Sequence, residues 1–262
     1  MLSFISTDLL LGLVFGLIVT SAGALVLYRR LTVAHARAQD AERLAELGTL
    51  TGGLAHEIKN PLSTIQLNLQ LLQEALADDK MTSPRVASRA ATITREAQRL
   101  RAILDDFLRY AGRLHVQPES TDLTELVGDL VDFLSPAAQQ SGTRVRLQPA
   151  DAPVIATVDP KLIKQAMLNL MLNAMQAVQG DGEIIVGVAR HPGRIALTVT
   201  DTGPGISAED QARVFDAYFS KRRGGTGLGL AMTRRIAQAH GGDVHLASVL
   251  GQGSSFSINL PM

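Results

Sequence analysis

Residues 54–76 have the sequence LAHEIKNPLSTIQLNLQLLQEAL, and their apolar positions decide the fold of this part of the chain. From Leu54 to Leu76 the seam residues follow in steps of 4, 4, 3, 4, 3 and 4, the spacing of a helix with one narrow apolar seam. A second pattern runs from Val86 to Ala111 in alternating steps of 4 and 3, and Gly112 follows it. Two such helices cannot bury their seams alone, so the sequence predicts a hairpin over residues 45–113 that dimerises as a four-helix bundle.

His56 lies off this seam. It falls about 160–200° around the helix from both Leu54 and Ile58, so we expect an exposed imidazole in mid-helix. Pro61 follows five positions later, where its ring conflicts with the carbonyl of Glu57. A surface histidine beside an incidental proline kink would produce the same pattern.

On the N-terminal side, residues Leu9–Tyr28 form a run of twenty residues without a charge. About 20 apolar residues span a bilayer, so residues 1–28 are predicted to be a transmembrane anchor. A buried core helix and a signal peptide are the alternatives, but Met1–Asp8 contains no Lys or Arg. The pair Arg29-Arg30 predicts that the rest of the chain lies in the cytoplasm. Residues 29–44 are expected to form a helix that connects the membrane to the hairpin.

Composition excludes several classes of function. The 262 residues carry 25 basic and 25 acidic side chains, so no basic field favours nucleic acid. The absence of cysteine excludes disulfides, thiolate metal sites and a cysteine nucleophile.

From about Gln117 the pattern changes to mixed helices and strands. Helices are predicted over 122–134, 160–179, 207–215 and 228–240, and strands over 143–148, 154–158, 183–189, 194–200, 243–248 and 255–260. This order predicts an α+β sandwich over residues 118–262, with helices on one face of a sheet. Gly112–Pro118 is the expected hinge to the hairpin.

Two polar features of this half are candidates for binding a ligand. Asn169 and Asn173 are four residues apart and share a helix face, where amides can hold phosphate oxygens and the water of a metal ion. Asp201 ends a strand before Thr202-Gly203-Pro204-Gly205, and its carboxylate can accept the amino proton of an adenine. Surface amides and a strand-ending turn are the structural alternatives.

Two further features lie close to each other in the sequence. Gly225-Thr226-Gly227-Leu228-Gly229 opens a helix, whose N-terminal N–H groups form an anion site. Phe215, Tyr218 and Phe219 precede the polar stretch Ser220–Gly225, which is predicted to be a mobile lid. An ordinary loop beside a core aromatic cluster is the alternative.

The order of these motifs resembles that of bacterial sensor histidine kinases. AHEIKNPL (55–62), NLMLNA (169–174), DTGPGI (201–206), VFDAYFSKR (214–222) and GGTGLGLA (224–231) are similar to the family's H, N, G1, F and G2 boxes. The resemblance covers roughly residues 44–262 and implies an ATP site of the gyrase/Hsp90/MutL type. Ala217-Tyr218 departs from the family, which commonly has Pro and Phe there, and this puts the lid geometry in doubt.

The resemblance implies an autophosphorylating protein histidine kinase. It assigns the phosphoacceptor to His56, its hydrogen-bond partner to Glu57, and to Asn60 a role in dephosphorylating a regulator. It places Mg²⁺ on Asn173. It assigns ATP contacts to Asn169, Asn173, Asp201, Gly203, Gly205, Phe219, Lys221, Gly225, Thr226, Gly227, Leu228 and Gly229.

The implied partners are a second copy of the chain and an aspartate on a separate response regulator. The apolar run Leu9–Tyr28 and the pair Arg29-Arg30 predict that such a kinase lies in the bacterial inner membrane. A membrane partner or the bilayer itself is then the expected source of the signal. Two other functions stay open: an ATPase or protein kinase of the same superfamily without phosphohistidine, and a membrane-tethered adaptor without enzymatic activity.

Overall fold

The computed structural model describes residues 48, 51–75, 83–150, 152–178, 180–222 and 225–262. The predicted anchor Leu9–Tyr28 and the connecting helix over 29–44 lie outside the described residues. Among the helices of the described ranges, none has the length and apolar content needed to cross a bilayer. Residues Gly53–Met262 form one compact unit, and every contact discussed below lies within it.

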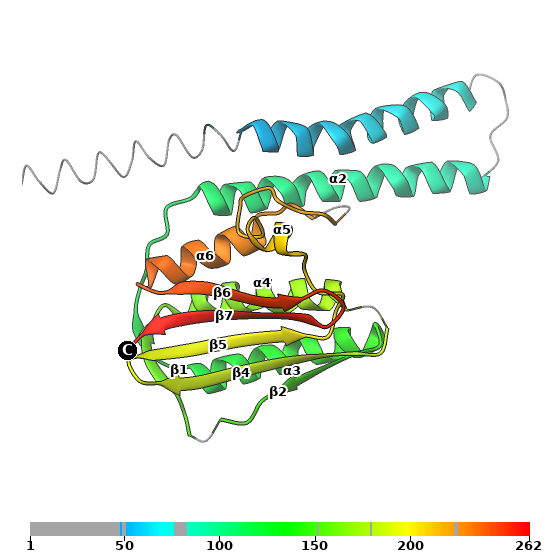
Figure 1. Ribbon diagram of the computed structural model, residues 1–262. Coiled ribbons are helices and arrows are strands. Elements are labelled where there is room, and N and C mark those ends of the chain that lie inside the picture. The colour runs from blue at the N-terminus through cyan, green and yellow to red at the C-terminus, as the bar shows by residue number, and fades with distance from the viewer. Residues whose placement is uncertain (1–47, 49–50, 76–82, 151, 179, 223–224) are drawn as a thin grey trace, which may run out of the picture. The chain divides into compact units, whose positions relative to one another are not determined.

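Two long helices begin this unit, as the seam pattern predicts (Figure 1). The first is helical throughout residues 51–75, and α2 spans Ser83–Ala111. The predicted seam residues Leu62, Leu69 and Leu104 remain 44%, 47% and 47% exposed in the single chain. The hairpin therefore leaves part of its apolar seam uncovered.

The second helix also has a buried face that the seam pattern did not predict. Ile103 and Tyr110 are 1% and 5% exposed, and Asp106 lies between them on the same side of α2. Asp106 and Tyr110 contact the C-terminal half, as described below. The second helix thus presents two surfaces, the seam of the hairpin and a face toward the C-terminal half.

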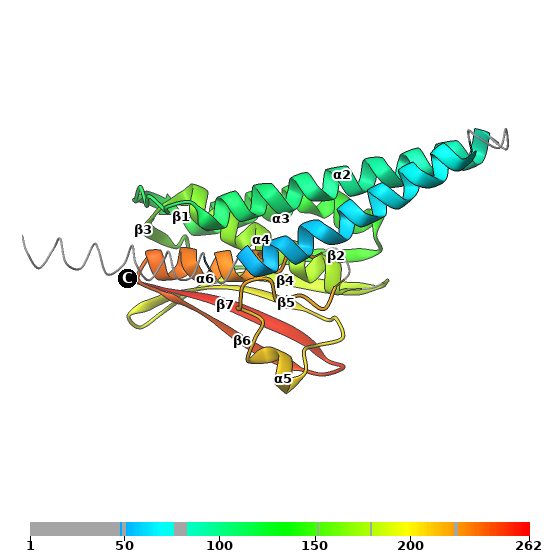
Figure 2. The same cartoon turned by 90° about the horizontal axis from the view of Figure 1, so that it is seen from above.

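The C-terminal half contains a five-stranded sheet in the order β2-β4-β5-β7-β6. Only β2 and β4 pair in parallel; the other neighbours are antiparallel. The strands are β2 (Thr143–Leu147), β4 (Gly182–His191), β5 (Arg194–Asp201), β6 (Asp243–Val249) and β7 (Gly253–Pro261). Figure 2 shows α3 (Leu123–Gln140), α4 (Pro160–Ala177) and α6 (Gly229–Ala239) on one side of this sheet, as predicted.

Local signals explain where these helices begin. The Asp159 carboxylate accepts the N–H groups of Lys161 and Leu162, and Pro160 occupies the first helical position of α4, where its missing N–H has no cost. The buried side of α4 includes Ile163, Ala166, Met167, Leu170, Met171 and Ala174. The core of the unit therefore forms between α4 and the sheet.

Three boundaries differ from the prediction. A strand β1 (Glu119–Asp122) pairs with β3 (Ile155–Val158) as a separate two-stranded sheet, which the sequence did not indicate. Helix α3 continues beyond Leu134 to Gln140 because Ala138 is fully buried. The predicted helix after Ser207 is a single turn, α5 (Ala208–Gln211), although its Ser207–Asp210 cap forms as expected.

Candidate active site

A cavity of about 450 Å³ lies between α4, the lid and the start of α6. Most of the predicted ATP contacts line it: Asn169, Asn173, Phe219, Gly225, Thr226, Gly227, Leu228 and Gly229. Ala102, Asp106 and Arg109 of α2 line it as well. The structure therefore brings the N box, the lid and the glycine loop together beside the second helix.

The two asparagines face this cavity in different ways. Asn169 Nδ2 donates to the Gly229 carbonyl at 3.1 Å and ties α4 to the start of α6. The side-chain and backbone oxygens of Asn173 accept from Arg222 Nη1 at 2.9 and 3.0 Å, and Gln176 Oε1 accepts from the same nitrogen at 3.2 Å. Three oxygens thus accept hydrogen bonds from one positively charged guanidinium at this point of the cavity.

These oxygens also match the ligands that Mg²⁺ prefers. Within the described residues, no cluster of three or more His, Asp or Glu side chains could hold a metal. A magnesium ion at Asn173 would therefore need further oxygens from a phosphate and water, which is the usual way that this ion is held beside a nucleotide.

Asp201 ends β5 and is only 3% exposed. Burial raises the pKa of its carboxyl, while the N–H groups of Gly203 and Ser254 and the charge of Arg222 act in the opposite direction. Its Oδ1 atom accepts the Gly203 N–H at 2.9 Å. Asp201, Gly203 and Gly205 do not line the cavity itself, so their predicted contact with adenine stays a prediction.

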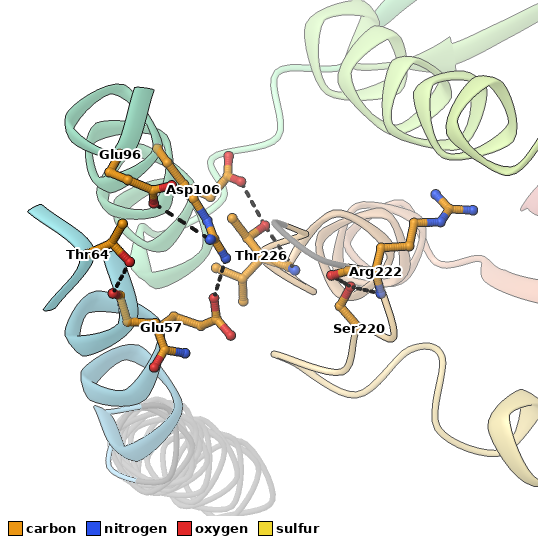
Figure 3. Close-up of polar contacts among 10 residues, drawn as sticks. Glu57, Thr64, Glu96, Asp106, Ser220, Arg222 and Thr226 are labelled. Atoms are coloured by element: carbon orange, nitrogen blue, oxygen red, sulfur yellow. Dashed lines mark hydrogen bonds and ion pairs between the residues drawn. The ribbon is translucent and has the colours of Figure 1, made fainter. Parts of the chain in front are cut away.

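The glycine loop is held from two sides. The Gly227 carbonyl accepts the Tyr218 N–H at 3.2 Å, and Gly227 has a φ of +66°, a conformation that favours glycine. Thr226 Oγ1 donates to Asp106 Oδ2 of α2 at 2.9 Å, as Figure 3 shows. No side chain of the described residues caps α6, so the N–H groups of its first turn can serve an anion.

A second contact joins α6 to the end of α2. Arg235 Nη1 donates to the Tyr110 carbonyl, and its guanidinium lies 4.7 Å from the centroid of the Tyr110 ring. The same side chain reaches the Gly112 carbonyl at 3.4 Å. This contact covers Tyr110, and together with the Thr226–Asp106 bond it joins α2 to the glycine loop and α6.

The first helix presents His56 to solvent, as predicted. Glu57 is partly buried, and its Oε2 atom lies 3.5 Å from Arg99 Nη2 of α2. Asn60 is exposed, and its carbonyl accepts the Thr64 hydroxyl at 3.2 Å. The imidazole is therefore accessible, while the neighbouring carboxylate is directed toward the second helix.

Comparison with known proteins gives two family matches. Residues 46–112 match the His Kinase A (phospho-acceptor) domain, and residues 158–262 match the histidine kinase-, DNA gyrase B- and HSP90-like ATPase. The chain is a member of the bacterial sensor histidine kinase family. The resemblance of the five motifs is thereby confirmed.

Relatives of this histidine kinase support the same assignment. The signal transduction histidine-protein kinase AtoS of Escherichia coli (strain K12) is 32% identical over 246 residues, which cover 92% of this chain and 39% of AtoS. The sensor histidine kinase ZraS of the same strain is 34% identical over 221 residues, or 84% of this chain and 47% of ZraS. The chain thus spans less than half the length of these curated relatives.

A solved structure shows the fold of the kinase. The histidine kinase ThkA, in complex with the response regulator protein TrrA, superposes with a TM-score of 0.71 at 24% identity, over 84% of this chain and 63% of that chain. The helical hairpin followed by an ATPase domain is therefore the architecture of this histidine kinase.

The sequence analysis assigned no role to three candidate side chains, Arg222, Asp106 and Arg99. Lys221 Nζ binds Asp210 Oδ2 at 2.7 Å and does not line the cavity, whereas its neighbour Arg222 does. Lys221 as a phosphate contact stays a prediction, and Arg222 is the better-placed cation. The contacts of Asp106 and Arg99 had no motif to indicate them, although the spacing of Ile103, Asp106 and Tyr110 matched a helix face.

Proposed function

We propose that this chain is an ATP-dependent protein histidine kinase that phosphorylates His56 and passes the phosphoryl group to an aspartate of a response regulator. The observation that carries the proposal is the exposed His56 on a chain whose cavity is lined by Asn173, Arg222 and the glycine loop. An outward imidazole in mid-helix can meet a nucleotide, whereas a core histidine could not.

In the proposed reaction, a lone pair on a neutral ring nitrogen of His56 attacks the γ-phosphorus of ATP. The N–P bond forms while the bond from phosphorus to the β,γ-bridging oxygen breaks, and that electron pair leaves with ADP. Glu57 accepts a hydrogen bond from the other ring nitrogen and stabilises the positive charge that develops there. The chemistry depends on positioning and charge neutralisation more than on covalent help.

The protein would bind ATP through three groups of residues. Asp201 accepts the adenine amino proton, the N–H groups of Gly227 and Gly229 and the side chain of Arg222 contact phosphates, and Asn173 with Asn169 holds Mg²⁺. When bound, Mg²⁺ neutralises phosphate charge.

We further propose that the chain is a homodimer in the bacterial inner membrane. The exposed seam residues Leu62, Leu69 and Leu104 support dimerisation, and the apolar run Leu9–Tyr28 supports an anchor that leaves residues 29–262 in the cytoplasm. A membrane partner or the bilayer supplies the input. Asn60 would serve the reverse reaction by orienting water against a regulator's phospho-aspartate.

The decisive experiment is labelling of the full chain with γ-labelled ATP and Mg²⁺. The unmodified protein should acquire an acid-labile, alkali-stable phosphoramidate, and His56→Ala should bind ATP but stay unlabelled. His191→Ala is the matched control, because His191 is exposed at the turn between β4 and β5 and should label normally. Label that persists in His56→Gln would refute the assignment, and label stable to acid would indicate a hydroxyl acceptor instead.

A further inference from the structure

Three charged side chains meet between the first helix and α2. Arg99 Nη2 lies 3.5 Å from Glu57 Oε2, and Arg99 Nη1 lies 3.8 Å from Glu96 Oε2. The side chains are partly buried, with 25% of Glu57, 32% of Arg99 and 22% of Glu96 exposed. Figure 3 shows Glu57 and Glu96 on different helices, with dashed lines that converge on the side chain between them.

This cluster is a poor source of stability. One positive charge serves two carboxylates, and both N···O distances exceed those of a short charge-assisted bond. Arg99 Nε and Glu96 Oε2 are buried without a hydrogen-bond partner among the described residues. Removing charges from water costs free energy that such long contacts do not recover fully. A different reason for keeping Arg99 at this position is therefore needed.

The carboxylate that Arg99 contacts across the two helices is that of Glu57, and this suggests such a reason. Glu57 follows His56 directly in the sequence, and its neighbour in space is Arg99 rather than open solvent. A glutamate side chain has several rotatable bonds, and ordering it before the reaction removes an entropic cost from the reaction itself. Only the Oε2 atom is engaged by Arg99, so the Oε1 atom stays available to a second donor.

We propose that Arg99 is a positioning residue, which holds Glu57 by Oε2 so that Oε1 can accept the N–H of the His56 ring during phosphoryl transfer. The inference rests on the proposed function. Glu96, three residues earlier on α2, attracts the Arg99 guanidinium at 3.8 Å and so favours its position. Arg99 does not line the nucleotide cavity, so its effect passes through Glu57 and not through ATP.

The geometry also explains the choice of arginine over lysine. The guanidinium offers Nη2 to Glu57 and Nη1 to Glu96, each from a fixed planar group. A lysine has one nitrogen on a flexible stem and cannot hold both carboxylates in the same geometry. Lysine should therefore restore the charge and only part of the positioning.

The test measures the initial rate of His56 phosphorylation in the full chain as a function of ATP concentration. We expect Arg99→Ala to lower kcat about tenfold, part of the roughly 10²–10⁴-fold that a positioned acid or base contributes, with KM for ATP within about twofold. Arg99→Lys should lie between the two proteins. The control is Arg101→Ala, which removes the same charge from α2 at a side chain that is 86% exposed, and it should resemble the unmodified protein.

A double variant separates positioning from a general effect on structure. If Arg99 acts through Glu57, then Arg99→Ala should cost nothing further in a Glu57→Gln background. Should Arg99→Ala fail to fold, Glu96→Gln replaces it, because this change removes only the second anchor and should lower kcat about threefold.

Several results would overturn the inference. The first is a kcat for Arg99→Ala equal to that of Arg101→Ala. The second is a loss of kcat on adding Arg99→Ala to Glu57→Gln that equals its loss in the unmodified protein, and the third is a rise in KM for ATP that accounts for the slower labelling of Arg99→Ala. Where Glu96→Gln is used instead, the result is a kcat equal to that of the unmodified protein. If the unmodified protein does not label at His56, the proposed function fails and this inference fails with it. If the unmodified protein labels normally at His56 and any of the results named above is found, only the role of Arg99 is refuted and the proposed function stands.

Discussion

Replacing Gly53 by alanine tests how the lid packs against the first helix. A Cβ atom at Gly53 would lie 2.6 Å from Cδ2 and 2.8 Å from Cγ of the Tyr218 ring, so the ring would have to move by about 1 Å to reach ordinary packing distance. Tyr218 cannot move freely, because its φ is +63° and its N–H is bonded to the Gly227 carbonyl. The added methyl group should therefore disturb the lid.

The magnitude follows from two opposing effects. Overpacking of this kind costs about 1–3 kcal/mol, whereas glycine to alanine within a helix gains about 1 kcal/mol. The matched control is Gly52→Ala, because Gly52 is exposed and a Cβ there would meet nothing within 4 Å. Gly52→Ala should stabilise the chain by about 1 kcal/mol, and Gly53→Ala should be less stable than this control by about 1–3 kcal/mol.

Urea denaturation of the full chain at a fixed protein concentration measures both variants. In a Tyr218→Ala background the obstacle is gone, so Gly53→Ala should then stabilise the chain as much as Gly52→Ala does. Equal stabilisation by the two alanines in the presence of Tyr218 would show that the ring does not rest on Gly53. The same variants assayed for labelling would show whether this contact also affects phosphoryl transfer.

Three further predictions concern single side chains. Asp201→Asn should weaken ATP binding at least about tenfold in calorimetry, because asparagine has one acceptor oxygen where the carboxylate has two, and the Gly203 N–H already bonds one of them. Because burial raises the pKa of Asp201, ionisation of this carboxyl destabilises the folded chain as pH rises through that pKa. Asp201→Asn should therefore be at least as stable as the unmodified protein at pH 7 without ATP. A clearly lower free energy of unfolding for Asp201→Asn would contradict this. Although burial alone would raise it, the N–H groups of Gln117, Leu162 and Lys161 hold the pKa of Asp159 below its usual value, so its contribution is present at neutral pH and is lost as pH falls through that pKa. Asp159→Ala should therefore cost about 2 kcal/mol at pH 7, with a smaller difference from the parent in urea titrations at about pH 3; a pH-independent difference would be inconsistent with this linkage. Arg222→Ala should weaken ATP binding about tenfold, whereas Lys221→Ala removes only the ion pair with Asp210 and should leave ATP binding nearly unchanged; the reverse ranking in calorimetry would support Lys221 as the phosphate contact.

Local chemistry made much of the fold predictable. The start of α4 depends on Asp159 and Pro160, which act within three residues of each other, and the cap at Ser207 likewise depends on a neighbour. The strands of the large sheet followed from apolar runs and the turns between them. These signals involve residues close in sequence, so no knowledge of distant contacts was needed.

Features that depend on distant partners were missed. The strand β1 is short and polar, and it pairs with β3 more than thirty residues later, a contact that no local pattern indicates. The face of α2 with Ile103 and Tyr110 was hidden because the seam spacing alone already explained the helix. A helix that presents two faces to partners carries two superimposed patterns, and the regular seam spacing masks the second one.

The candidate site shows the same division. The asparagines, the glycine loop and Phe219 meet around one cavity, as the motifs predicted. The choice between Lys221 and Arg222 could not be made from the sequence, since adjacent residues of a loop point in directions set by the backbone. In the structure, Lys221 forms an ion pair with Asp210, whereas Arg222 donates a hydrogen bond to Asn173.

The segment between the two halves of the kinase is hydrogen-bonded near both of its ends, at Gly112 and Gln117. Arg235 holds the Gly112 carbonyl on one side, and Asp159 Oδ2 accepts the Gln117 N–H at 2.9 Å on the other. Five peptide steps separate these two anchors, so the segment between them extends at most about 18 Å. Both anchoring side chains belong to the catalytic half, so while both contacts hold, the end of α2 is fixed to that half. Release of the Arg235 contact would free the segment from Gly112 to Gln117. Only then could the catalytic half move relative to α2, and extra glycines in this segment would increase that movement only in the released state.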